Sequence, residues 1–460
     1  MAPAAVEDLT LMLQPTPTVL GSASAGDPYL PASGNGGYTV DHYDLELDYR
    51  VATNRLTAIA TITARALTGL GRFSLDLAGL SVDRATVNGV APAKTVHAAR
   101  KLVLTPAVPL AAGETFEVVV RYRGAPRPVR SHWGELGWEE LTDGVLVAGQ
   151  PSGAPSWFPC NDHPSDKATF RIQLTCEAPY TVVSNGPLVA RSTRSGRTTW
   201  TFDVREPMAA YLASVQIGRY RRHDIAAAPV AHSLFFPPAL ARPVAVDFAR
   251  LGEMIAVFSE AFGPYPFPAF SVIVTADDLE IPLEAHGLAV FGRNHVDGMH
   301  GSDRLIAHEL AHQWFGNSLT LTRWADIWLH EGFACYAEWI WAEASGGLTA
   351  HSNAVLHRAE LDLLPKNLVV ADPGPHDMFD DRVYKRGALA LHAVRQAIGD
   401  EAFFTALRAY ARTHRHGSVT TADLLGCFDV ASGTRVADKI VARWVSSKSL
   451  PQLQPAPPAP

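Results

Sequence analysis

The segment HELAH at residues 308–312 has the residue types and spacing of a catalytic metal site. In a helix, His308 and His312 lie on one face with their Cβ atoms about 5–6 Å apart, so both imidazoles can bind one cation. Glu309 lies on the same side but is turned away from both histidines. That position suits a base that acts on an activated water without binding the metal. With 18 histidines in the chain, the pentapeptide alone is suggestive rather than decisive.

A candidate third ligand lies in WADIWLHEGFACYAEW, where Glu331 follows His312 by nineteen positions on a second predicted helix. A catalytic zinc ion prefers three protein ligands and one open position for water. The sequence therefore predicts one Zn²⁺ per chain, held by His308, His312 and Glu331. Zinc lowers the pKa of water to about 7, and Glu309 can take that proton and pass it to a leaving amine.

Two further carboxylates could orient a ligating histidine through its free ring nitrogen. Glu338 lies seven residues after Glu331 and almost on the same helix face, and Asp326 precedes Glu331 by about one and a half turns. For each, a solvated surface carboxylate is the equally good alternative. Cys335 also falls on this face, where we expect a small buried residue rather than a fourth ligand.

The rest of the sequence must position these residues, and its 460 residues suggest two or three domains. Alternating apolar and polar residues over 38–218 predict a β-rich domain. Helical spacing dominates 219–450, with one strand in AFSVIVT. We expect an irregular arm at 1–37 and a proline-rich tail at 451–460.

Composition narrows the classes of function. A net charge of −7 offers no basic field for a nucleic-acid partner. The N-terminus lacks a basic region before its apolar run, and no segment is long enough to span a bilayer, so we predict a cytoplasmic protein without a membrane span. A disulfide framework is not expected from four widely spaced cysteines, Cys160, Cys176, Cys335 and Cys427.

HELAHQWFGN followed by WLHEGFA resembles the gluzincin aminopeptidases, the zinc metallopeptidase family of aminopeptidase N and leukotriene hydrolase. WFPCNDHPSDKATF at 157–170, YTVVSN at 180–185 and VYKRGA at 383–388 extend the resemblance over most of the chain, from about Tyr38 to about Leu450. It implies an α+β multidomain fold, with a saddle-like antiparallel β-sheet domain before a mainly helical, thermolysin-like peptidase domain. Longer members carry a further helical domain, so the resemblance implies a short form.

The resemblance also implies roles outside the metal motif. Tyr384 would donate to the oxyanion of the tetrahedral intermediate, although an isolated tyrosine is more often a packing residue. Glu284 and Gln150 would hold the free amine of the substrate. The family strand reads Gly-Ala-Met-Glu-Asn, whereas this chain has IPLEAHG, in which only Glu284 matches. Pro282 lacks the N–H that an edge strand would offer to a bound peptide.

Three functions are compatible with these features. The first is an aminopeptidase acting on peptides with a free N-terminus. The second is an endopeptidase or processing peptidase of the same fold with an open cleft. The third, a catalytically silent binding module, is disfavoured because Glu309, Tyr384 and the metal ligands are all present.

Overall fold

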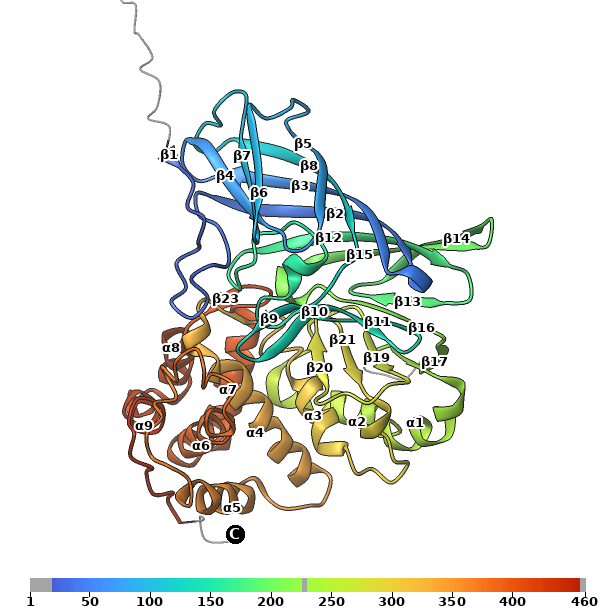
Figure 1. Cartoon of the computed structure of the whole chain (residues 1–460). Coiled ribbons are helices and arrows are strands. Elements are labelled where there is room, and N and C mark those ends of the chain that lie inside the picture. Colours follow the sequence, from blue (N-terminus) through green and yellow to red (C-terminus); the bar gives the residue numbers. More distant parts are fainter. Residues whose placement is uncertain (1–18, 226–229, 456–460) are drawn as a thin grey trace, which may run out of the picture.

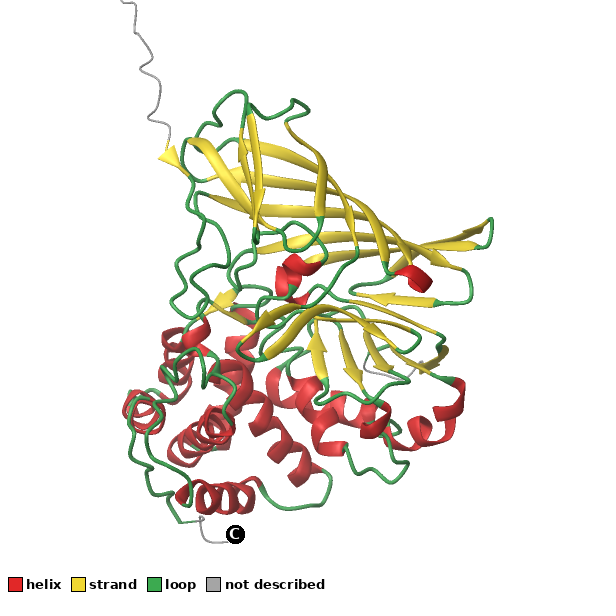
Figure 2. Ribbon diagram, viewed as in Figure 1, coloured by secondary structure: helices red, strands yellow, loops and turns green. Residues whose placement is uncertain are grey.

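The computed structural model describes residues 19–225 and 230–455 (Figure 1). Strands dominate the first half and helices the second (Figure 2). The expected arm, residues 1–37, falls partly outside the described residues, and so does the expected tail, residues 451–460. Their described parts are irregular apart from the short strand β1, Val19–Leu20.

The largest sheet has the strand order β14-β15-β12-β2-β3-β8-β5. Every second residue of β12, Lys167–Glu177, is buried, because successive side chains of a strand point to opposite faces. Neighbouring strands are antiparallel except β2 and β12, which run parallel. The other bounds are β2 Tyr38–Arg50, β3 Arg55–Ala66, β5 Ser81–Val87, β8 Thr115–Gly124, β14 Leu188–Arg194 and β15 Arg197–Ala209.

Two smaller sheets, β1-β4-β7-β6 and β13-β16-β11-β10-β9, complete the β-rich domain and confirm its predicted class. The second sheet lies next to the helical half of the molecule (Figure 1). Their bounds are β4 Leu70–Asp76, β6 Lys94–Ala98, β7 Lys101–Thr105, β9 Val129–Ser131, β10 Gly134–Leu141, β11 Gly144–Ala148, β13 Thr181–Ser184 and β16 Val215–Gly218.

The second half opens with a mixed sheet in the order β17-β18-β19-β21-β20. The prediction of a single strand, AFSVIVT, was wrong: it is β19, Phe270–Val274, but it has partners. Those strands are three to five residues long, too short for a clear alternating pattern. They are β17 Arg221–Ile225, β18 His232–Phe236, β20 Leu283–Ala285 and β21 Leu288–Phe291.

Helices fill the rest of this half, as predicted. Their bounds are α1 Ala241–Asp247, α2 Leu251–Phe262, α3 Asp303–Ala311, α4 Trp328–Ala344, α5 Ala350–Asp362, α6 Asp381–Ile398, α7 Asp400–Thr413, α8 Thr421–Ser432 and α9 Val436–Val445. A small parallel pair joins β22, Thr320–Leu321, to β23, Ser418–Val419.

Helices α4 and α6 cross at two glycines. A Cβ atom on Gly332 would lie 2.8 Å from the Cα atom of Gly387, so the backbones approach as closely as they do only without side chains there. Next to Gly387 on α6, the Arg386 guanidinium donates to the carbonyl oxygens of Trp444 and Ser447, each at 2.6 Å. The helix that bears Glu331 and the helix that bears Tyr384 thereby pack closely against each other, and α6 is also held to the end of α9.

The described part of the N-terminal arm connects the two halves of the molecule. The Asp27 carboxylate accepts a hydrogen bond from the Trp324 backbone N–H at 2.8 Å. The Tyr29 hydroxyl accepts from the Gly374 N–H at 2.7 Å and also bonds to the Asp372 carboxylate. The arm therefore contacts segments that flank α4 and α6.

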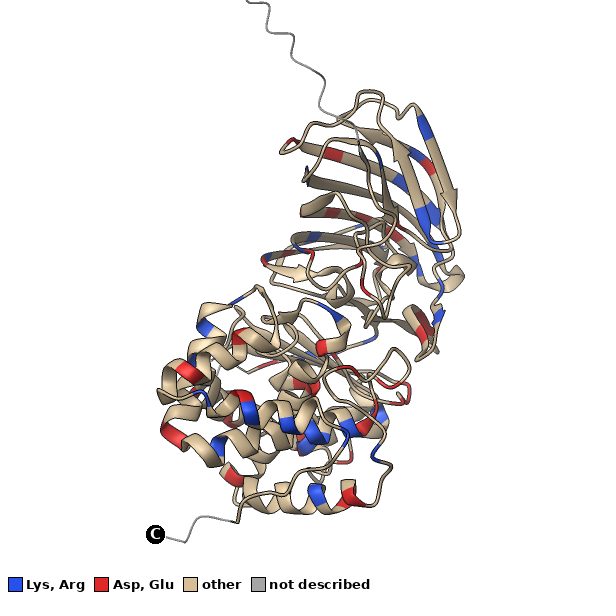
Figure 3. Ribbon diagram, turned by 90° about the vertical axis from the view of Figure 1, so that its left-hand side faces the viewer, with Lys and Arg blue, Asp and Glu red and all other residues tan. Residues whose placement is uncertain are grey.

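Lys and Arg residues are interspersed with Asp and Glu along both halves of the ribbon (Figure 3). No helix in the described ranges is both long and apolar enough to cross a membrane. The four cysteines, all within those ranges, are free thiols.

Candidate active site

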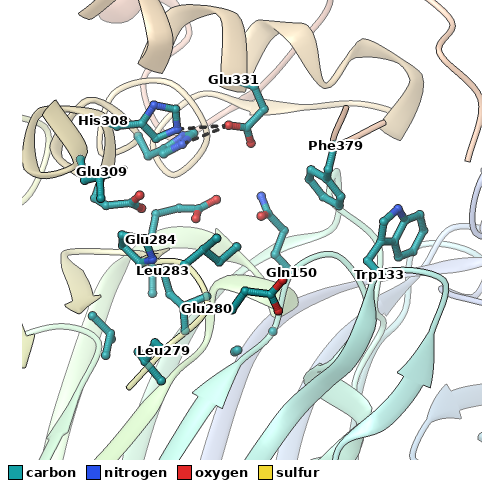
Figure 4. A pocket seen from close by; sticks show the side chains of 18 of the residues that line it. Trp133, Gln150, Leu279, Glu280, Leu283, Glu284, His308, Glu309, Glu331 and Phe379 are labelled. Atoms are coloured by element: carbon teal, nitrogen blue, oxygen red, sulfur yellow. Dashed lines mark ion pairs between the residues drawn. The ribbon is translucent and has the colours of Figure 1, made fainter. Parts of the chain in front are cut away.

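The predicted metal ligands come together from two helices. The Glu331 Oε2 atom lies 3.4 Å from the Nε2 atom of His308 and 3.4 Å from that of His312 (Figure 4). Ligand bonds of about 2.1 Å at a tetrahedral angle separate donor atoms by about 3.4 Å. Two imidazole nitrogens and one carboxylate oxygen are also a donor set that zinc accepts. The residues present therefore fit a zinc ion.

The Nδ1 atom of each histidine has a hydrogen-bond partner, and the Nε2 atom faces the shared site. The Nδ1 atom of His308 lies 2.7 Å from Glu338 Oε1, and that of His312 lies 3.1 Å from the Phe315 carbonyl oxygen. Although burial opposes charge on His308, its hydrogen bonds to Glu331 and Glu338 raise the pKa of the imidazole well above its ordinary value. The structure thus places Glu338 where the sequence suggested.

Asp326, the other candidate for orienting a histidine, lies elsewhere, so that interpretation was wrong. Its carboxylate accepts from Arg323 Nε at 2.8 Å and from the Thr421 hydroxyl at 3.2 Å. Asp326 ends a 3-10 turn, Trp324–Asp326, whereas α4 begins only at Trp328. The prediction assumed that α4 extends back to Asp326. Because it does not, the Asp326 side chain points in a different direction from the one expected.

Glu309 lines the same pocket as the three predicted ligands. Its buried Oε2 atom has no hydrogen-bond partner among the described residues. Burial raises the pKa of Glu309 to about 7, with His308 opposing that shift and Glu284 adding to it. A carboxylate in this environment can both accept and release a proton near neutral pH.

Tyr384 lies beside the ligands on α6. Its ring stacks on the imidazole of His308, with centroids 5.9 Å apart. Burial and the nearby carboxylates of Glu331 and Glu284 raise the pKa of the Tyr384 phenol well above 10. The phenol therefore keeps its proton and is available as a hydrogen-bond donor.

The two predicted amine-binding residues line the same pocket (Figure 4). Carboxylate or imidazole atoms of Glu284, Glu309 and His312 all lie within 4.8 Å of one another. Burial raises the pKa of Glu284, while His312 lowers it. Gln150, just beyond β11, brings its amide from the β-rich domain, and its Nε2 atom has no partner in the described part of the chain.

Three amides that the sequence analysis did not single out fix the turn after Glu284. Asn317 Nδ2 donates to the Ala285 carbonyl oxygen at 2.9 Å, and Gln313 Oε1 accepts from the Gly287 N–H at 2.9 Å. Asn185 Nδ2 donates to the His286 carbonyl oxygen at 2.9 Å. Gln313 and Asn317 belong to HELAHQWFGN and Asn185 to YTVVSN, so the signal was in motifs already noticed.

The pocket has a volume of about 590 Å³ and lies between the two halves of the chain. On one wall, Trp133 and Phe379 pack edge to face, with ring centroids 5.8 Å apart. Cys335 is buried and, as expected, is not among the groups that could hold a metal. A cavity of this volume next to the metal site has the size for a short peptide.

The site has the features of a thermolysin-like zinc metallopeptidase. Two histidines lie one helical turn apart, the next helix supplies a carboxylate, and a glutamate that is not a ligand lies beside them. Residues 247–444 match the Peptidase family M1 domain, and residues 39–212 match the Peptidase M1 N-terminal domain. The chain belongs to peptidase family M1, which confirms the predicted family and the zinc cofactor.

Known relatives agree with this assignment. An M1 zinc metallopeptidase from Deinococcus radiodurans, solved as a mutant bound to a Tyr-Ser-Ala substrate, is 33% identical, with a TM-score of 0.86 over 94% of this chain and 99% of that one. Aminopeptidase M1 of Arabidopsis thaliana is 25% identical over 93% of this chain and 52% of its own length. Human endoplasmic reticulum aminopeptidase 1 is 26% identical over 83% of this chain and 44% of its own. The chain spans about half the length of these curated relatives.

Proposed function

We propose that the protein is a zinc-dependent aminopeptidase that hydrolyses the N-terminal peptide bond of peptides. The main observation behind this proposal is that side-chain ligand atoms of Glu284, Glu309 and His312 all lie within 4.8 Å of one another. It puts a carboxylate that is not part of the ligand triad beside the catalytic base, at a distance suited to the α-ammonium of a substrate whose first carbonyl is at the metal site. The names of the relatives, which include aminopeptidases, support the same activity.

His308, His312 and Glu331 would hold the zinc ion, which supplies a Lewis acid and lowers the pKa of water to about 7. Glu309 accepts the proton of the attacking water and delivers it to the departing amine. Tyr384 donates its O–H to the oxygen that becomes negative in the transition state. Glu284 and the Gln150 amide oxygen receive the substrate ammonium.

The experiment compares one peptide with a free and with an acetylated N-terminus. Acetylation removes the positive charge that Glu284 would bind, and losing one partner of a buried charged pair costs about 2–5 kcal/mol. We expect hydrolysis of the acetylated peptide to be at least about a hundredfold slower in the wild type. In Glu284→Ala this difference should largely disappear, because the free peptide loses its anchor.

Cleavage products identify the alternative. If the wild type hydrolyses both peptides at equal rates and at internal bonds, the protein is a processing endopeptidase. The departure from the family strand at Ile281 and Pro282 would explain such a result. The cytoplasmic location inferred from the sequence stays a prediction.

A further inference from the structure

Two cationic side chains, Arg304 and Lys385, line the same pocket as Glu284, the proposed amine anchor for the substrate. Arg304 lies on α3 one turn before His308. Glu284, in contrast, is grouped with His312 at the other end of that helix. Positions 304 and 312 are about 12 Å apart along the helix axis, with the metal site between them.

Contacts with α4 give the same order. Cys335 and Glu338 follow Glu331 along one face of α4, about 6 and 10 Å further along the helix axis. The Lys385 ammonium lies 3.7 Å from Cys335 Sγ, and Arg304 Nη1 lies 3.1 Å from Glu338 Oε2. Both cations are therefore beyond the metal ligands, on the side away from the amine anchor.

The Lys385 ammonium has few hydrogen bonds for its charge. Burial opposes that charge, but Cys335, Glu338 and Asp381 nearby outweigh burial and raise the pKa of Lys385, so the side chain is a cation. It is only 13% exposed. In the described part of the chain its hydrogen-bond partner is a thiol, a weak acceptor, and the Asp381 carboxylate is 3.8 Å away, too far for a hydrogen bond. An ammonium has three donors, and a half-enclosed cation without strong acceptors favours an anionic ligand.

Arg304 also has donors to spare. Among the described residues, its guanidinium donates only through Nη1, to Glu338. A guanidinium has five N–H groups and can bind a carboxylate through two of them at once. Arg304 can therefore keep its contact with Glu338 and accept a second carboxylate from a ligand.

We propose that Arg304 and Lys385 bind the free α-carboxylate of dipeptides and tripeptides, which would then be the preferred substrates. This inference rests on the proposed aminopeptidase function. With its ammonium at Glu284 and its first carbonyl at the metal site, a peptide advancing about 3.3–3.6 Å per residue reaches the cations after two or three residues. A longer peptide presents neutral peptide groups there and forms no ion pair.

The test measures kcat/KM for release of the first residue from a tripeptide and from the same tripeptide with a C-terminal amide. We expect the wild type to prefer the free acid by about 10- to 100-fold, the effect of a partly buried charge-assisted contact. In the double variant Arg304→Gln with Lys385→Met, the preference should fall below about threefold. A second double variant, Arg304→Gln with Lys385→Arg, keeps a cation at position 385 and should recover part of the preference for the free acid.

Lys94→Met is the matched control, since Lys94 is exposed on β6 and does not line the pocket. It should keep the wild-type preference. Equal kcat/KM of the wild type for acid and amide would overturn the proposal. A double variant that loses activity on both peptides in equal proportion would also overturn it and make the pair structural. Failure of the wild type to release the first residue from either peptide would refute the aminopeptidase function itself.

Discussion

At the scale of single residues, two different acceptors set the direction of the metal-binding imidazoles. Glu338 is a charged acceptor for His308, whereas His312 donates to a backbone carbonyl. A carboxylate makes its histidine a stronger donor of electrons to the metal than a neutral carbonyl does. Both histidines therefore present Nε2 to the metal site, but the Nε2 atom of His308 is the more basic of the two.

Glu309→Gln tests the assignment of the base. The amide keeps the size of the side chain and leaves all three predicted ligands, so zinc content should stay at one per chain. Turnover should fall by several orders of magnitude, because the amide cannot accept a proton. Elemental analysis and steady-state kinetics check both expectations, and a variant that lost its zinc would show that Glu309 supports the metal instead.

Tyr384→Phe removes one hydroxyl next to the site. We expect kcat to fall by about 10²–10³ with little change in KM, since the hydroxyl would act only on charge that develops in the transition state. Kinetics on a single tripeptide provide the measurement. Unchanged turnover would assign Tyr384 to packing against His308, the contact that the variant retains.

At the scale of elements, the distance between α4 and α6 determines whether Tyr384 can reach the metal site. Glu331 precedes Gly332 by one residue, and Tyr384 precedes Gly387 by less than one turn. The glycine crossing therefore lies directly beside both functional side chains. Any separation of the helices at this point moves the hydroxyl away from the site.

Gly387→Ala should separate the helices, because its Cβ atom would lie 2.8 Å from the Cα atom of Gly332. Overpacking of this kind costs about 1–3 kcal/mol, and we expect a lower melting temperature together with lower kcat. Gly426→Ala in α8 is the control: nothing lies within 4 Å of its added Cβ atom, so stability should stay equal or rise. Equal melting temperatures for the two variants would contradict a tight crossing.

The elements also show what the sequence can predict. HELAH and Glu331 revealed the metal ligands because helical spacing determines their geometry locally. Asp326 was misplaced because it precedes the start of α4, and the strand partners of β19 were missed because each is too short to show a period. The hydrogen bond from Asn185 to the turn after Glu284 joins segments 101 residues apart, a contact that no local pattern encodes.

At the scale of the whole molecule, the active site belongs to both halves of the chain. Gln150 comes from the β-rich domain, and the arm reaches from that domain to segments beside α4 and α6. The pocket therefore depends on the relative position of the two halves. Residues far from the metal can change substrate binding through this interface.

Asp27→Ala probes that connection, because it removes the acceptor of the buried Trp324 N–H. An unsatisfied buried donor costs about 1–3 kcal/mol, so thermal unfolding should begin at a lower temperature. Asp83→Ala, which removes a partly exposed pair with Arg123, should have little effect. If both variants unfold at the same temperature, the arm does not stabilise the interface.

The hydrogen bonds of Arg386 connect the helix that bears Tyr384 to residues that are made late in synthesis. Domains form from the N-terminus as the chain leaves the ribosome, so the β-rich half with Gln150 is made first. The helix that carries Tyr384 receives its carbonyl partners only when Trp444 and Ser447 have been added. A nascent chain that ends before these residues has the zinc ligands but not the fixed tyrosine, and we expect newly made protein to be proteolytically silent until that segment folds.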